Sequence, residues 1–209
     1  GLSTSVIALS TVLAVPAFAD VSAADVWANQ QTLYEGMGIS LSGDLANDAI
    51  SGAMLNIVLP QGMANMQVST DADVAMTDNG DGTVTVTFPS PMTVKASGTA
   101  QGEGTFYATL TLTHDGYTVV ASGEPNDVSY ASEVTNLRFE PEEIMMDGTP
   151  LSEEDFEVSG FLEMAGWTSN SRVTVGNLIS YMAETSFDTT EADYEFTVDG
   201  IRTTNTQTT

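Results

Sequence analysis

The segment TFYATLTLTHDGYTVVASG, residues 105–123, decides the fold because apolar and polar residues alternate along it on both sides of an Asp-Gly pair. Successive side chains of a β-strand point to opposite sides of the sheet. The segment therefore predicts an apolar face of Phe106, Ala108, Leu110 and Leu112 and a polar face of Tyr107, Thr109, Thr111 and Thr113. Asp-Gly between two alternating runs is a strong hairpin signal, so we expect a hairpin that turns at Asp115-Gly116.

A second hairpin is predicted by MTDNGDGTVTVTFP, residues 76–89. Its Asp- and Gly-rich tip could instead be a calcium loop. With Gly82 at the sixth position of an EF-hand loop, however, Thr77 and Phe88 occupy the first and twelfth positions, where carboxylate ligands are needed. The alternation before and after the tip favours a hairpin turn.

The remaining segments extend this pattern to most of the chain. Ser22 and Asp25 form a capping-box pattern, and an apolar stripe follows, so we expect one helix from Ala23 to Gly36 that packs Trp27 and Tyr34 onto a sheet. Further strands are expected at 53–60, from Met63, from Met92, at 156–164, at 172–183 and from Tyr194. We predict a mainly β fold, with one long, curved, mostly antiparallel sheet of hairpins and a single N-terminal helix.

The first 19 residues have the character of an export signal. They carry no charge, are mostly apolar, and end in Ala17-Phe18-Ala19 after Pro16. This is a small-residue cleavage pattern, so we expect a signal peptide over residues 1–19, cut between Ala19 and Asp20. It lacks the basic n-region. We expect residues 20–209 to form one β-rich domain whose chain continues beyond Thr209.

The charge balance restricts the partners. The chain has 4 Lys and Arg against 29 Asp and Glu, a net charge of −25. Such a surface repels nucleic-acid phosphates and anionic lipid headgroups, so we expect no nucleic-acid partner. Attraction to basic partners or divalent cations stays open. After the signal peptide, no segment is expected to cross a membrane as a helix.

Catalytic and metal motifs are sparse. The chain has no cysteine and one histidine, His114, which flanks the Asp115-Gly116 turn and is expected to be an exposed residue. A nucleophile elbow and a phosphate-binding loop are both missing from the sequence. We expect no enzyme activity, no cofactor and no metal site. If the chain does bind a cation, Asp71, Asp73, Asp78 and Asp81 are the candidate ligands.

Several stretches resemble a known family: VLAVPAFADVSAADVWANQQ, MTDNGDGTVTVTFPSPMTV, TFYATLTLTHDGYTVVASGEPNDVSY and TVDGIRTTNTQTT. Together they are similar to exported alphaproteobacterial proteins catalogued as a domain of unknown function. The resemblance implies a periplasmic or envelope location, and that this chain is the N-terminal part of a longer one. It implies no activity and no site residues.

Two functions fit these features equally, and a third fits less well. The first is a non-enzymatic periplasmic or cell-surface protein whose apolar sheet face, with Phe106, Leu110 and Leu112, binds a lipid-like or other hydrophobic ligand or a protein partner. The second is a structural or adhesive β protein with a closed core. The third is a glycosidase that uses two of the many carboxylates. The sequence names no ligand and no oligomeric state.

Overall fold

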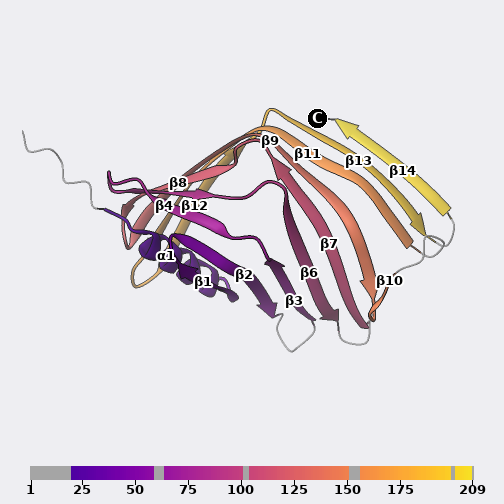
Figure 1. Ribbon diagram of the computed structural model, residues 1–209, viewed down its shortest axis with the longest axis horizontal. Helices are drawn as coiled ribbons and strands as arrows, with labels where there is room; N and C mark the ends of the chain where they lie inside the picture. Colours follow the sequence, from indigo (N-terminus) through magenta and orange to yellow (C-terminus); the bar gives the residue numbers. More distant parts are fainter. Residues whose placement is uncertain (1–19, 59–63, 101–103, 151–155, 199–200, 209) are drawn as a thin grey trace, which may run out of the picture.

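The structure is a computed structural model that describes residues 20–58, 64–100, 104–150, 156–198 and 201–208 (Figure 1). The predicted signal peptide, residues 1–19, lies outside the described residues. As expected, the fold is mainly β, with one helix and one large antiparallel sheet. Its elements are α1 (Ala23–Gly36), β1 (Ile39–Ala46), β2 (Ala49–Val58), β3 (Ala64–Thr70), β4 (Val74–Asp78), β5 (Thr83–Thr87), β6 (Met92–Ala100), β7 (Gly104–His114), β8 (Thr118–Glu124), β9 (Asp127–Met146), β10 (Thr149–Pro150), β11 (Phe156–Val175), β12 (Ile179–Ser186), β13 (Thr189–Val198) and β14 (Ile201–Thr208).

Long strands hold the sheet together across a bend. Strands β3 and β4 follow one another along the same edge of β2, and β7 and β8 do so along one edge of β9. Between them, β6 pairs with β3 and β7, whereas β5 pairs with β4 and β8. On its other side β9 pairs with β11, which carries β12 and β13 end to end. The strand breaks therefore lie side by side, and Figure 1 shows the sheet folding over along this line.

The predicted hairpin at Asp115-Gly116 is wrong. β7 and β8 do not pair with each other; both run antiparallel to β9, with Leu112 opposite Phe139 and Val119 opposite Ser132. The backbone N–H of Asp115 donates to the Asn136 carbonyl at 3.0 Å, so the loop stays attached to β9 instead of reversing the chain. The Asp-Gly pair is thus a bend within one continuous edge.

Two further expectations have different outcomes. The hairpin within residues 76–89 is confirmed, because β4 pairs with β5 and the Asp78 carboxylate accepts the N–H of Gly80 within the turn. The single strand expected at 172–183 is wrong, since the chain reverses between β11 and β12. Even so, Val173 pairs with Tyr181 and Val175 with Ile179, so these four side chains do share one face.

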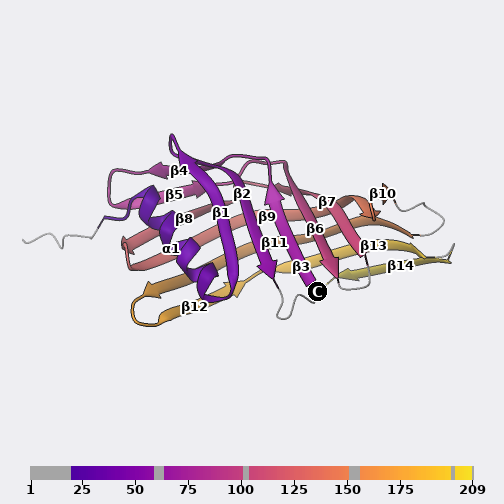
Figure 2. The same cartoon turned by 90° about the horizontal axis from the view of Figure 1, so that it is seen from below.

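The helix covers only one half of the sheet. We call the part under α1, with β1, β4, β5, β8, β12 and the adjoining ends of β2, β9 and β11, the covered half. We call the part with β3, β6, β7, β13, β14 and the other ends of those long strands the open half. Figure 2 shows α1 in front of the covered half only. The helix contacts β1 on one side and β11 and β12 on the other, so it closes the curled sheet.

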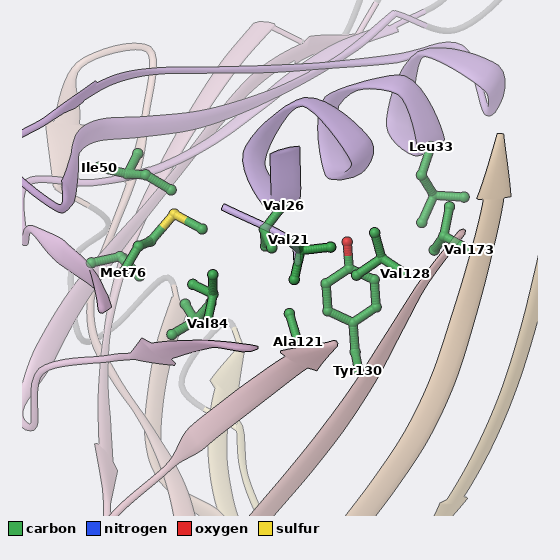
Figure 3. Packing of buried hydrophobic residues seen from close by; sticks show 12 residues of the cluster. Val21, Val26, Leu33, Ile50, Met76, Val84, Ala121, Val128, Tyr130 and Val173 are labelled. Carbon is green, nitrogen blue, oxygen red and sulfur yellow. The ribbon is translucent and has the colours of Figure 1, made fainter. Parts of the chain in front are cut away.

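The main core lies between α1 and the covered half. Figure 3 shows Leu33 of the helix beside Val173 of β11, while Val21, just before the helix, reaches the centre and is only 2% exposed. A second, smaller core of Met92, Leu112, Val134 and Leu137 lies at the bend. The core is therefore concentrated under the helix and along the line where the sheet folds.

Candidate functional site

A cavity of 370 Å³ lies between α1 and the concave face of the covered half. Its walls come from the helix, from β1 and β2, from β4 and β5, and from β8, β9 and β11. Most of the lining is apolar or aromatic, and the aromatic residues among those described are Trp27, Tyr34, Phe88, Tyr117, Tyr130 and Trp167. Small-molecule sites have this size and this kind of lining.

The helix is fixed over the cavity by its first turn. The Asp25 N–H donates to Ser22 Oγ at 3.2 Å, and the Ser22 N–H donates to Asp25 Oδ2 at 3.0 Å, which confirms the expected capping box. The Val21 N–H donates to the Gly82 carbonyl at 3.3 Å and ties the segment to the β4–β5 turn. Such caps satisfy N–H groups that the helix itself leaves unpaired.

An aromatic row forms the wall at the bend. The ring of Tyr117 stacks between Phe88, with centroids 4.8 Å apart, and Trp167, with centroids 6.1 Å apart. His114 supports this row, since its Nδ1 accepts the N–H of Tyr117 at 3.0 Å and its Nε2 lies 3.1 Å from the Pro89 carbonyl. The neutral tautomer that carries its proton on Nε2 makes both bonds. His114 is half-buried, so the expectation of an exposed residue is wrong, because both of its ring nitrogens are within hydrogen-bonding distance of the backbone at this wall.

Polar groups reach the cavity mainly as hydroxyls. Tyr130 donates to Asn29 Oδ1 at 2.7 Å, within the buried core. Burial raises the pKa of Tyr130 to about 12, partly offset by a hydrogen bond with Gln30, and burial also raises the pKa of Tyr34 and Tyr117. Asn29 Nδ2 and Trp167 Nε1 are buried with no partner among the described residues. The raised pKa values show that burial disfavours the negatively charged form of these tyrosines.

The apolar face predicted from β7 lies on the same side of the sheet as the cavity. Ala108, which shares that face with Phe106 and Leu110, pairs through Ala96 and Val68 with Leu55, and Leu55 lines the cavity. Leu112 is buried in the second core. Phe106 and Leu110 belong to the open half, where they are half-buried and do not line the cavity.

The acidic cation candidates do not come together. Asp71 forms an ion pair with Lys95, and the Asp81 carboxylate accepts the N–H of Thr83 at 3.1 Å within its own turn. Asp78 binds the Gly80 N–H, and Asp73 is exposed. Among the residues that the structure describes, no three acidic or histidine side chains are grouped as a metal site would need.

Most of the cavity residues were missed at the sequence level. Trp27 and Tyr34 were expected to face the sheet, but Tyr117, Tyr130 and Trp167 carried no signal beyond strand alternation. They meet only because β8, β9 and β11 curl beneath α1. The available clue would have been an aromatic residue just before β8 and one on the inner face of each of β9 and β11.

Comparison of the chain with family models, curated proteins and solved structures finds no significant match in any of the three. Within the described ranges, the single helix is too short and too polar to cross a membrane.

Proposed function

We propose that this chain is an exported, non-enzymatic protein of the periplasm or cell surface that holds an apolar ligand in the cavity beneath α1. The observation that carries the proposal is the cavity itself, 370 Å³ in volume with aromatic walls and a few hydroxyls. Ligand sites combine apolar walls with a small number of polar groups that orient the ligand. Export is supported by the apolar segment that ends at Ala19 and by the resemblance to exported alphaproteobacterial proteins.

Both tryptophans of the chain, Trp27 and Trp167, line this cavity. Their fluorescence therefore reports on the cavity alone. The neutral probe N-phenyl-1-naphthylamine should quench tryptophan emission and gain intensity as it binds to the purified protein. A probe that leaves both signals unchanged at saturating concentration would contradict the proposal.

A matched pair of variants tests whether the probe binds inside the cavity. Ser171 lines the cavity, whereas its neighbour Asn170 is exposed on the opposite face of β11. Ser171→Leu should fill the cavity and weaken probe binding by about tenfold, which corresponds to about 1.4 kcal/mol. Asn170→Leu adds the same side chain outside the cavity and should leave binding unchanged. Equal losses in the two variants would place the probe elsewhere.

A second candidate function is binding of a protein partner. It is favoured by the apolar residues exposed around β12, among them Leu178, which is 86% exposed, and Tyr181, which is 53% exposed. An edge strand with exposed apolar residues can pair with another chain. Copurification of a stoichiometric partner, lost on Tyr181→Lys with the cavity probe still bound, would favour this second function.

A further inference from the structure

We infer that the cavity selects uncharged ligands, such as alcohols, esters or quinone-like compounds with an apolar body, and rejects anionic lipids and fatty acids. This inference rests on the proposed ligand-binding function and names the ligand class. Its basis is the distribution of charge around the cavity.

No described residue that lines the cavity carries a charge. His114 lies behind Tyr117 with both ring nitrogens hydrogen-bonded, and it does not line the cavity. The three described Lys and Arg side chains lie on the opposite face of the sheet. Each is paired there, Lys95 with Asp71, Arg138 with Glu140 and Glu163, and Arg172 with Asp127. A carboxylate or phosphate in the cavity would therefore lie without a partner.

An unpaired anion is costly to bury, because it loses hydration and gains no compensating charge. The cavity tyrosines respond to the same environment, since burial raises the pKa of Tyr34, Tyr117 and Tyr130 and so keeps them neutral. The protein's net charge of −25 adds a long-range repulsion against anions. Both effects favour a neutral ligand.

Hydroxyl groups are available to orient such a ligand. Among the described residues, the side-chain oxygens of Tyr34, Tyr117 and Ser171 have no protein hydrogen-bond partner, and all three residues line the cavity. A hydroxyl can both donate and accept a hydrogen bond. The site therefore suits the hydroxyl of an alcohol or the carbonyl of an ester or quinone.

A matched pair of competitors tests the inference. At pH 7.5 and high salt, which screens long-range repulsion, 1-decanol should displace N-phenyl-1-naphthylamine from the full chain more than about tenfold better than decanoate. Equal competition by the two compounds, with the probe bound, overturns the inference and leaves the proposed function standing. Failure of the probe to bind contradicts the proposed function itself.

A charge variant tests the cause. Gln30 lines the cavity from α1, and Gln30→Lys adds a cation while keeping a good helix former. The variant should bind decanoate at least about tenfold better than the wild type and 1-decanol about equally. An unchanged ratio of the two affinities in a folded variant overturns the inference. Ser171→Lys, placed on the sheet, repeats the test should Gln30→Lys fail to fold.

Discussion

The covered and open halves have the same strand pattern and different interiors. In both, one face of the sheet is apolar and the other carries Thr, Glu and ion pairs such as those of Arg138 and Arg172. Under α1, the apolar side chains form a continuous core around Val128 and Val173, which are fully buried. In the open half, Phe106 and Leu110 stay half-buried, and no described element lies over them.

The difference shows that alternating apolar and polar residues produce an apolar sheet face, whereas burying that face requires a second layer of structure. The open half has the pattern of a buried sheet face, yet its residues lack the second layer that a core requires. The covered half gains that layer from a single helix of 14 residues, and the helix leaves a cavity where it does not fill the curl. Equivalent substitutions in the two halves should therefore have different costs.

The largest effect is expected for Leu33→Ala. Leu33 is 6% exposed and packs from α1 against the main core. Removing a buried leucine side chain and leaving a cavity costs about 2–5 kcal/mol of unfolding free energy. Urea denaturation followed by circular dichroism measures this loss. A cost below about 1 kcal/mol would mean that the helix does not hold the covered half together.

The second-largest loss of unfolding free energy is expected at alkaline pH, where the covered half is destabilised. Burial raises the pKa of Tyr130 to about 12, above the ordinary value near 10, so the folded state favours its neutral form. This contribution, about 3 kcal/mol, is fully present below about pH 10 and is lost as pH rises through about 12. Tyr34 and Tyr117 shift in the same direction.

Unfolding free energies between pH 8 and pH 12, with tyrosinate absorbance as a second signal, check the alkaline prediction. Tyr130→Phe provides the control, because the variant has no hydroxyl to ionise and should show a shallower decline. Parallel declines in the wild type and the variant would show that Tyr130 does not govern the loss.

A smaller effect is expected at the helix cap. Ser22→Ala removes the acceptor for the Asp25 N–H and should cost about 1 kcal/mol. Ser40→Ala, an exposed serine of β1, is a control that should stay within about 0.5 kcal/mol of the wild type. The cap variant should also weaken probe binding, since α1 forms one wall of the cavity. Equal stability of the two variants would contradict the role of the cap.

Effects no larger than that of the cap are expected in the open half. Leu110→Ala removes a half-buried side chain from a face with no second layer, so about 1 kcal/mol should be lost instead of the cost of a core leucine. Thr109→Ala, on the outer face, should change stability by no more than about 0.5 kcal/mol. Thermal unfolding of both variants measures the difference. A cost for Leu110→Ala equal to that of Leu33→Ala would show that the open face is covered in solution.

Sequence reasoning located most elements but mispaired some of them. The helix, its cap and the 76–89 hairpin followed from local signals within a few residues of each other. The Asp115-Gly116 pair looked like a hairpin turn, yet β7 and β8 both pair with β9. A turn motif specifies a local change of direction, whereas the pairing depends on which distant strand lies alongside. The cavity residues were largely missed for the same reason.

The sequence by itself determined the strand and helix content, the apolar and polar faces, the acidic surface and the absence of cysteine chemistry, because these depend on residue type and on spacing along the chain. The tertiary structure alone decided the bend, the partner of each strand and the cavity. At Gly166 of β11, a φ of +64° lies at the bend, and the inward-facing residues change from Met164 on one side to Trp167 on the other. This three-residue step keeps the inner face apolar in both halves. Its effect depends on how β9, β11 and α1 pack together, which local sequence does not specify.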